Sequence, residues 1–308
     1  MGNLLRKQMI PSSTSLQPEL PPDTKPLQHQ VAGHVFGKSK TKYGILQRCS
    51  TGDILKPIID ERGLREEQFY KDVFSEQASE NLRAFRPFIS KFFGTYEYGG
   101  INYMTLENII HPFVHPCVAD IKIGRITYDA GASKEKIEEY RRKFPALADI
   151  GFQLLGWQVY RPADKSYEYH DKVCGRSLTR EEMPHAIAHF YGAPLETYRE
   201  IVRSVLKHLI AVEQIMAKQC DLTFIATSLL IVYEGQKSAQ NESQHQERRI
   251  DVRLVDFAHV SKHEEGVETG QVDENFLSGL RNYMNDLRKV LDDTYVYVPI
   301  DKLNRSMH

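Results

Sequence analysis

Alternating hydrophobic and polar positions dominate the first third of the chain. Apolar residues at every second position, with glycines between the runs, are typical of short β-strands. This pattern predicts strands at residues 30–37, 43–48, 53–58 and 101–109. Residues 64–78 instead place apolar side chains at helical spacing. We therefore expect an antiparallel sheet with one helix, which together form a small N-terminal lobe over residues 28–110.

Residues 111–295 show longer and more mixed patterns, which predict a larger C-terminal lobe. Apolar positions at helical spacing and polar starts predict helices at 132–143, 179–191, 197–219 and 273–291. Two of these starts, at Thr179 and Thr197, read as capping boxes because a glutamate follows three residues later. Continuous apolar runs predict strands at 228–235 and 250–260.

Three segments lack a pattern that could bury apolar surface. Residues 1–27 are rich in proline and serine, and residues 236–249 are polar and of low complexity. We expect the first to be a flexible tail, the second a mobile loop between two strands, and residues 296–308 a C-terminal tail. The predicted fold class is thus α+β, with two lobes around a cleft.

Composition limits the classes of function. The 308 residues are 41% hydrophobic and 26% charged, enough for two lobes with a substantial core. The net charge of -1 creates no general attraction for nucleic acid or membranes, so we expect no nucleic-acid partner. Four scattered cysteines indicate reduced thiols in an intracellular protein, and no apolar run could span a membrane. Nothing suggests a coiled coil, and we expect a monomer.

The stretch HPCVADIKIGRITYD, residues 115–129, carries charge inside an apolar strand. Side chains alternate between the two faces of a strand, so Ile121 would face the core while Asp120, Lys122 and Gly124 face the other way. A carboxylate and an ammonium beside a glycine that lets a ligand approach the backbone suit a phosphate-handling site. An ordinary ion pair on a half-exposed strand is the alternative.

Two further features could handle phosphate. Asp256 ends an apolar strand, where a carboxylate can hold Mg²⁺ beside nucleotide phosphates or simply cap a turn. His259 follows it as a ligand contact or a turn residue. Lys56 on a predicted strand and Glu66 on the next helix have the order of the lysine–glutamate pair of kinases, although any surface strand and helix could supply such a pair.

Together these motifs resemble the inositol polyphosphate kinase family. The segment Pro116–Gly124 fits P-x-x-x-D-x-K-x-G, and SLL at 228–230 and DFAH at 256–259 follow in the family's order. HQVAGH at 29–34 and GRSL at 175–178 are also similar, so the resemblance covers roughly residues 28–292. HQVAGH and DFAHV are most similar to the multikinase branch. The resemblance implies a kinase-like fold with ATP in the cleft.

For the nucleotide, the resemblance implies a role for each matching position. Lys56 would bind ATP phosphates with support from Glu66, and Glu107 would begin the hinge that meets adenine through backbone groups. Asp120 would contact the ribose. Asp256 would hold Mg²⁺, with Ser228 nearby.

For the acceptor, the resemblance implies that Lys122 lies between the γ-phosphate and an inositol hydroxyl, so that Lys122 and Asp120 are the catalytic pair. Lys136 and His259 would bind the inositol phosphate. Helices at about 133–217, which include Lys136, would form much of the inositol-phosphate-binding region. The chain departs from the multikinase pattern at Asn108, Glu139 and Tyr140. A glutamate facing a polyphosphate would repel it, which bears on substrate preference.

The expected activity is therefore Mg²⁺-dependent transfer of phosphate from ATP to inositol trisphosphate and tetrakisphosphate. Phosphatidylinositol bisphosphate is a further substrate by resemblance. We expect the protein itself to lie in the cytoplasm, the nucleus or both. The alternatives within the family are an inositol hexakisphosphate kinase and a trisphosphate 3-kinase. A non-catalytic protein that binds inositol phosphates is the alternative of a different class. The joint presence of Lys56, Asp120, Lys122 and Asp256 favours an enzyme.

Overall fold

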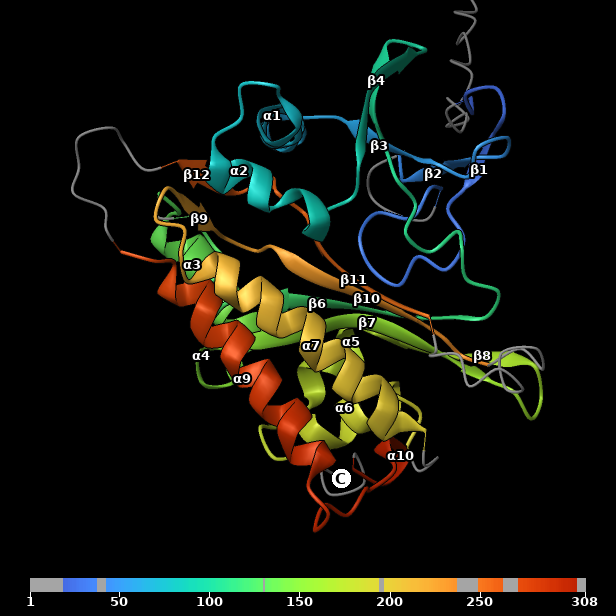
Figure 1. Cartoon of the computed structure of the whole chain (residues 1–308), viewed down its shortest axis with the longest axis vertical. Coiled ribbons are helices and arrows are strands. Elements are labelled where there is room, and N and C mark those ends of the chain that lie inside the picture. Colours follow the sequence, from blue (N-terminus) through green and yellow to red (C-terminus); the bar gives the residue numbers. More distant parts are fainter. Residues whose placement is uncertain are drawn as a thin grey trace, which may run out of the picture.

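Two antiparallel sheets stacked one above the other form the body of the molecule (Figure 1). The computed structural model describes residues 19–37, 43–129, 131–193, 197–236, 249–262 and 271–303. The predicted α+β, two-lobed fold is confirmed, because a small sheet lies at the top in Figure 1 and a larger, helix-covered sheet lies below it. No helix in these ranges is both long and apolar enough to cross a bilayer.

The upper sheet has the strand order β1-β2-β3-β5-β4. Its strands are β1 (Thr24–Pro26), β2 (Leu46–Arg48), β3 (Ile54–Ile58), β4 (Phe92–Tyr98) and β5 (Ile101–Leu106). Helix α1 (Glu61–Phe74) begins where Asp60 accepts hydrogen bonds from two amides of its first turn. The short helices α2 (Glu80–Ala84) and η1 (Arg86–Phe88) lead from α1 to β4.

The start of this lobe corrects two sequence predictions. Residues 24–26 lie in the segment predicted as a tail, yet they form β1, and Leu27 lines the cleft between the lobes. Residues 30–37 form no strand, although their alternation predicted one. Gly33 and Gly37 have φ angles of 78° and 71°, a backbone region typical of turns rather than strands. Strand β4 had no counterpart in the prediction.

The lower sheet has the order β11-β10-β6-β7-β8. Its strands are β6 (Pro116–Ile123), β7 (Phe152–Arg161), β8 (Ser166–Asp171), β10 (Ser228–Glu234) and β11 (Ile250–Val255). The strands β9 (Leu222–Phe224) and β12 (Val260–Lys262) pair separately. Strand β6 is central, and its neighbours β10 and β7 run antiparallel to it. This position places the PCVADIKIG segment in the middle of the molecule.

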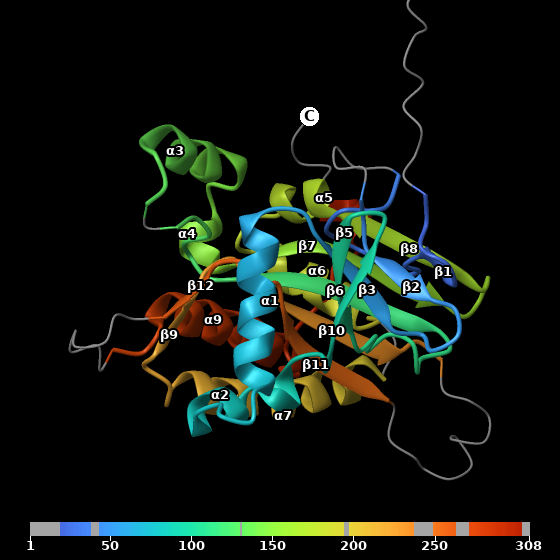
Figure 2. The same cartoon turned by 90° about the horizontal axis from the view of Figure 1, so that it is seen from above.

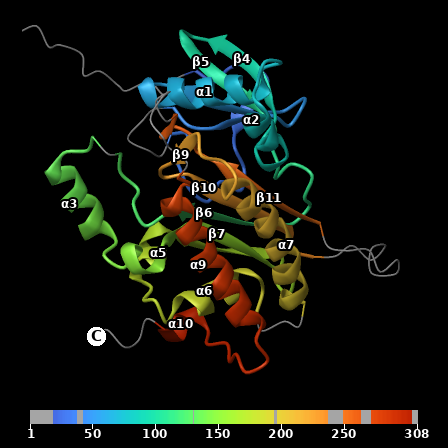
Figure 3. The same ribbon diagram turned by 60° about the vertical axis from the view of Figure 1, so that its left-hand side comes forward.

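Helices cover the face of the lower sheet that points away from the cleft (Figures 1 and 3). They are α6 (Met183–Phe190), α7 (Tyr198–Met216) and α9 (Glu274–Leu291), with the short α4 (Leu147–Ile150), α5 (Lys172–Ser177) and α10 (Ile300–Leu303) around them. The apolar face of α9 supplies Phe276, Leu280, Tyr283 and Leu287, which are fully buried. Burial of these side chains contributes most of the energy that holds helix and sheet together.

Local details separate correct from incorrect predictions in this lobe. The reciprocal hydrogen bonds predicted for Thr179 and Glu182 form, but they lie in the turn before α6, which begins at Met183 and not at the predicted start near residue 179. Thr197 makes no capping hydrogen bond through its side chain. Within the predicted C-terminal tail, residues 300–303 form α10, and Ile300 is buried. Residues 237–248, nearly all of the predicted mobile loop, lie outside the described residues.

Helix α3 (Lys134–Lys143) projects from the side of the molecule, as Figures 2 and 3 show. It buries none of its residues, although Ser133 caps its first turn as a helix start requires. This helix coincides with the polar helix predicted from the sequence. Its basic residues are consequently exposed at the surface.

Candidate active site

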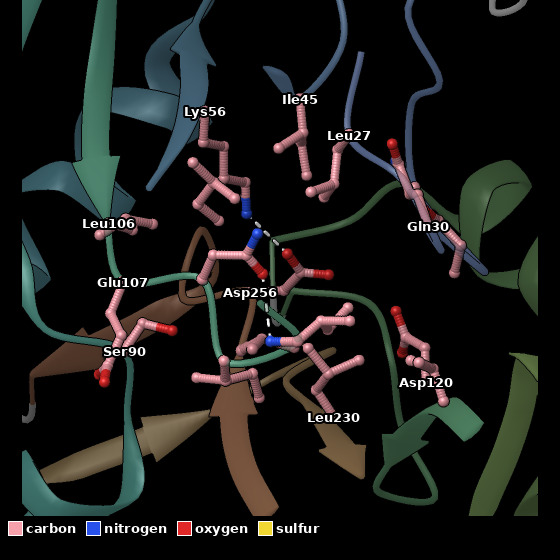
Figure 4. Close-up of a pocket in the computed structure, with 18 of the residues that line it drawn as sticks. Leu27, Gln30, Ile45, Lys56, Ser90, Leu106, Glu107, Asp120, Leu230 and Asp256 are labelled. Atoms are coloured by element: carbon pink, nitrogen blue, oxygen red, sulfur yellow. Dashed lines mark hydrogen bonds and ion pairs between the residues drawn. The ribbon is translucent and has the colours of Figure 1, made fainter. Parts of the chain in front are cut away.

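A cavity lies between the two sheets and is lined by both lobes (Figure 4). Its apolar part is formed by Leu27, Ile45, Ile54, Leu106 and Leu230, which come from five separate segments of the chain. Its polar part contains Lys56, Glu66, Asp120 and Asp256. An apolar slot that ends in charged groups suits a ligand with a flat apolar ring and a charged tail.

Lys56 connects the lobes through two ion pairs. Its Nζ atom lies 2.8 Å from Glu66 Oε1 on α1 and 2.7 Å from Asp256 Oδ1, which follows β11. Burial opposes the ammonium charge, but the two carboxylates together raise the pKa of Lys56 far above its usual value. Burial also raises the pKa of Glu66, against the effect of Lys56. The pair predicted from strand and helix order is therefore formed, and Asp256 joins it.

Asp256 occupies an unusual backbone position at the end of β11. Its φ angle is 65°, a strained value for a residue with a side chain, and its carbonyl accepts a hydrogen bond from Thr227 Oγ1. Nearly half of its side chain, 47%, remains exposed to the cavity. Burial works against its charge, but Lys56 and Lys122 hold the pKa of Asp256 below its usual value. An anionic carboxylate is thus presented to the cavity.

Asp120 and Lys122 lie on the cleft face of β6, and Ile121 and Ile123 on the buried face are at most 1% exposed. The predicted alternation is thus confirmed. Burial and the nearby Asp256 raise the pKa of Asp120 to about 7. Burial likewise lowers the pKa of Lys122, while Asp256 and Asp120 oppose this.

Two oxygen-bearing side chains near Asp256 are candidate ligands for a cation. Asp120 and Ser228 both place buried oxygen atoms there, and a hydrogen bond from Ser228 opposes the rise in the Asp120 pKa. Ser228 pairs with Lys122 across β10 and β6, which puts its side chain on the same face of the sheet as Asp120. Carboxylate and hydroxyl oxygens are suitable ligands for a small hard cation. Ser228 itself does not line the cavity, so Asp256 is the more accessible of the two predicted ligands.

The hinge between the lobes begins at Glu107. Its amide donates to the carbonyl of Lys91, and its carboxylate accepts from the Lys91 amide, so the side chain is held against the chain that enters β4. Asn108 then folds back to accept a hydrogen bond from the amide of Ile110. The cavity is lined here by residues 107–110. The Glu107 side chain thus fixes the turn, while the backbone after it borders the apolar slot.

The predicted acceptor-binding residues are less tightly grouped. His259 contacts Asp129, whose carboxylate oxygens lie 2.9 and 3.0 Å from its Nδ1 atom. Lys136 is exposed on α3 and makes no salt bridge in the described structure. The ion pair of Glu139 with Lys143 turns that glutamate's charge toward its own helix. Neither His259 nor Lys136 lines the cavity.

Some residues at the cavity could not be assigned from the sequence. The positive charge of Arg176 on α5 lowers the pKa of Lys122, although Arg176 does not line the cavity. His29, in the HQVAGH segment, lines the cavity with a φ angle of 58° and a hydrogen bond to Gln158. Both positions lie in the segments HQVAGH and GRSL that resemble the family, and this resemblance was the only signal.

Gly124 has a different role from the predicted one. A Cβ atom there would lie 2.8 Å from Asn275 Nδ2, and its φ angle of 115° is strained for other residues. Gly279 of α9 is similarly close, with its own hypothetical Cβ 2.6 Å from the Gly124 amide. The glycine therefore allows α9 to approach the end of β6, and we find no ligand-facing role for it.

A comparison with known families decides the relationship. A family model described as inositol polyphosphate kinase matches residues 103–288, which is more than half of the chain. The chain belongs to the inositol polyphosphate kinase family. The matched range contains β6, β10 and β11, and therefore Asp120, Lys122 and Asp256. Lys56 and Glu66 precede it.

Individual relatives agree with this family. Inositol polyphosphate multikinase of Rattus norvegicus is 36% identical over 233 residues, which cover 73% of this chain and 58% of that protein. Inositol hexakisphosphate kinase 3 of Homo sapiens is 28% identical over 209 residues, covering 61% of this chain and 51% of that protein. The chain thus spans only about half the length of these two relatives. The higher identity agrees with the multikinase branch.

A solved structure supports the fold of this family member. The inositol phosphate multikinase Ipk2 of S. cerevisiae, in complex with ADP and Mn²⁺, superimposes with a TM-score of 0.65. The likeness covers 78% of this chain and 99% of that chain, at 24% sequence identity. The two-lobed arrangement around the cavity is therefore shared with a family member.

Proposed function

We propose that this protein is an ATP-dependent kinase that phosphorylates hydroxyl groups of soluble inositol polyphosphates. The observation that carries the proposal is the arrangement around Lys56. Its ammonium joins Glu66 and Asp256 across the lobes, and Asp120 and Lys122 lie nearby on one face of β6. A protein that only bound inositol phosphates would not need this set of carboxylates beside an apolar slot.

ATP would lie in this cavity with its base toward the hinge and its phosphates toward Lys56. Adenine would occupy the apolar slot and meet the backbone after Glu107, while the ribose hydroxyls would donate hydrogen bonds to the Asp120 carboxylate. The phosphates would then reach Lys56, whose position is fixed by Glu66. Positioning of this kind supplies much of the rate of phosphoryl transfer, because the reaction needs little covalent assistance from the protein.

Asp256 would hold a divalent cation, with the Ser228 hydroxyl and an Asp120 oxygen close to it. When bound, such a cation neutralises charge on nucleotide phosphates. The protein's own contribution is to keep the Asp256 carboxylate ionised through Lys56 and Lys122. The Mn²⁺ of the S. cerevisiae structure shows that a relative binds a divalent cation together with ADP. We propose Mg²⁺ for this chain.

Lys122 would lie between the transferred phosphate and the attacking hydroxyl. Its ammonium stabilises charge that develops on the phosphoryl group, and such preorganised charges are among the largest contributions to catalysis. Arg176 adds positive charge on the same side. His259, oriented by Asp129, and Lys136 on α3 would bind phosphates of the inositol ring.

We further propose inositol trisphosphate and tetrakisphosphate as the substrates, in keeping with the multikinases among the relatives. The exposed basic residues of α3 would engage differently phosphorylated rings. The experiment is to incubate the purified protein with Mg-ATP and labelled inositol 1,4,5-trisphosphate and to separate the products by anion exchange. Successive tetrakis- and pentakisphosphate peaks are expected.

A Lys122→Ala variant is the control for this assay, and it should lose at least about 100-fold in rate, as expected for removal of one positioned charge. Near-normal turnover in this variant would refute the role of Lys122. A single tetrakisphosphate would indicate a trisphosphate 3-kinase, and conversion of hexakisphosphate alone would indicate a hexakisphosphate kinase. Vesicles with phosphatidylinositol bisphosphate test the lipid substrate separately. Binding without any product would refute the kinase proposal.

A further inference from the structure

A cysteine, a histidine and a glutamate form a chain of contacts beneath α5, outside the cavity between the lobes. Cys174 Sγ lies 3.7 Å from His170 Nδ1, and His170 Nε2 lies 2.8 Å from Glu168 Oε1. Because a carboxylate only accepts hydrogen bonds, Nε2 carries the proton and Nδ1 is left to accept the thiol proton. A nucleophile next to a base that is oriented by a third group is the arrangement of activated nucleophiles.

The surroundings hold the histidine in this orientation. The ring of Trp157 stacks on His170 with centroids 4.6 Å apart and 14° between the planes. Arg161 donates to the other carboxylate oxygen of Glu168 and so holds the carboxylate in place. Burial of the ring opposes its charge, but Cys174 and Glu168 raise the pKa of His170 to about 9.

A metal ion is a weaker interpretation of the same cluster. Glu168, His170 and His189 point one ligand atom each at a common region. The guanidinium of Arg161, however, already donates to His189 Nε2 at 2.7 Å and to Glu168. A positive group thus occupies the space where a cation would bind, and it would have to leave before His189 and Glu168 could act as ligands. The contact of Cys174 with His170 involves no such competition.

We propose that Cys174 is an activated thiol that reacts with electrophiles and peroxides. The thiol is partly exposed, which allows small reagents to reach it. His170 accepts its proton, and the resulting imidazolium stabilises the thiolate, which is the nucleophilic form of cysteine. Among the other three cysteines, Cys49 is exposed and Cys117 is buried. Cys49 therefore serves as an internal reference within the same chain.

The Cys174 thiolate would react with an alkylating reagent and with a peroxide by two different routes. With iodoacetamide, sulfur forms a bond to carbon, the carbon–iodine bond breaks, and iodide leaves. With hydrogen peroxide, sulfur attacks one oxygen and the oxygen–oxygen bond breaks. Sulfur is oxidised by two electrons to sulfenic acid, and the released hydroxide takes the proton from His170 and leaves as water.

Modification of Cys174 would also disturb the acceptor side of the cavity, a consequence that rests on the proposed function. Cys174 lies on α5, two residues before Arg176, whose charge acts on Lys122. Gly175, which lies between Cys174 and Arg176, sits so close to β7 that a Cβ atom added to it would lie 2.1 Å from the carbonyl of Leu154. Helix α5 therefore cannot move toward the sheet to accommodate an added group, and an adduct must shift it outward together with Arg176.

The first experiment measures alkylation of each cysteine in the whole protein. Limiting iodoacetamide is added at pH 7.0, and peptide mass spectrometry follows Cys174 and Cys49 in the same sample. An ordinary thiol is only about 3% thiolate at this pH, so an ionised thiol offers about 30 times more of the reactive form. A thiolate of lower pKa is less nucleophilic, and the expected rate is therefore about 10-fold faster. A Cys174 rate no higher than that of Cys49 would overturn the proposal.

A His170→Gln variant tests the role of the base, with His208→Gln as its match. His208 is an exposed histidine on α7 that contacts only the backbone of Ser204 among the described residues. We expect the Cys174 rate to fall to the Cys49 level in His170→Gln and to stay unchanged in His208→Gln. An undiminished rate in a folded His170→Gln protein would contradict the activation mechanism. Should His170→Gln fail to fold, the wild-type comparison with Cys49 decides.

The second experiment tests the link to activity. Wild-type protein and Cys174→Ser are treated with iodoacetamide, or with peroxide followed by dimedone to trap sulfenic acid, and assayed with Mg-ATP and inositol trisphosphate. Treatment should lower the wild-type rate at least about 5-fold and leave the rate of Cys174→Ser unchanged. Equal inhibition of both proteins would refute the link through α5. Fast alkylation in a protein without kinase activity would uphold the thiol and refute only the proposed function.

Discussion

Asp120 is the residue whose protonation state should control nucleotide binding. Burial and Asp256 raise its pKa from 3.8 to about 7, so near neutral pH the free protein holds a mixture of acid and carboxylate. A ribose diol donates its hydrogen bonds best to the carboxylate. At pH 6 only about a tenth of the carboxyl is ionised, so the affinity for Mg-ADP should rise about 10-fold between pH 6 and pH 8. Calorimetric titration at several pH values measures this change.

The matched variant is Asp120→Asn, which keeps the shape and removes the titration. Its Mg-ADP affinity should be lower, and any remaining pH dependence belongs to the nucleotide. The stability of the free protein changes with pH in the opposite direction to nucleotide affinity. Because folding raises the pKa of Asp120, the contribution of Asp120 to stability falls as the pH rises from about 4 to about 7. An identical pH profile in both proteins would assign the effect to another group.

At the same scale, residues could be placed from the sequence where the side-chain alternation of a strand fixed their position. Asp120 and Lys122 could be placed on one face because side chains of a strand alternate, and the residues that follow each of them, Ile121 and Ile123, are apolar. The contact of Asp256 with Lys56 joins residues 200 positions apart, and no local pattern reports such a distance. The Cys174–His170 contact depends on the turn from β8 into α5, which the sequence pattern does not reveal.

At the scale of elements, an ion pair fixes the start of α6 against α9. Arg180 donates to both carboxylate oxygens of Asp286, at 2.6 and 2.7 Å, and the Asp286 side chain is fully buried. Asp286→Asn leaves a guanidinium facing a neutral amide and removes one buried charge. Breaking a buried pair typically costs about 3–5 kcal/mol, so the free energy of unfolding in urea should fall by about that amount.

Two controls show whether the pair itself is responsible. Glu139→Gln breaks the exposed pair with Lys143 on α3 and should leave the urea midpoint unchanged. Arg180→Met combined with Asp286→Leu replaces the pair by apolar groups, and it should recover much of the lost stability because no unpaired charge is left buried. A double variant as unstable as Asp286→Asn would show that the cost lies in packing rather than in the lost pair.

Elements with a long apolar period were predicted with accurate bounds, whereas some short segments at the start of the upper lobe were predicted wrongly. Helix α9 was found nearly residue for residue because its apolar side chains recur over 18 residues. The segment at 30–37 alternates like a strand, but its glycines and the hydrogen bonds of Gln30 to the carbonyls of Ala32 and His34 fold it into a turn. Strand β1 has three residues, too few for any period to appear.

At the scale of the molecule, the lobes are held together partly by groups that a nucleotide would engage. Lys56 from the upper sheet contacts Asp256 from the lower sheet, and the cavity wall is shared between them. A ligand that binds this folded arrangement stabilises it by mass action, by about 2.7 kcal/mol at a concentration 100 times its Kd. Mg-ADP at that concentration should therefore raise the melting temperature by about 5 °C.

Removal of the cation distinguishes the role of Asp256 from that of Lys56. With EDTA in excess, the stabilisation by ADP should shrink, because Asp256 and the nucleotide phosphates would then face each other as like charges. In Asp256→Asn that repulsion is absent, so ADP should give nearly the same shift with and without EDTA. Lys56→Met should lose most of the shift under both conditions, since the phosphates have lost their cationic partner from the upper lobe. A metal-dependent shift of wild-type size in Asp256→Asn would place the cation elsewhere and would remove Asp256 from the proposed mechanism.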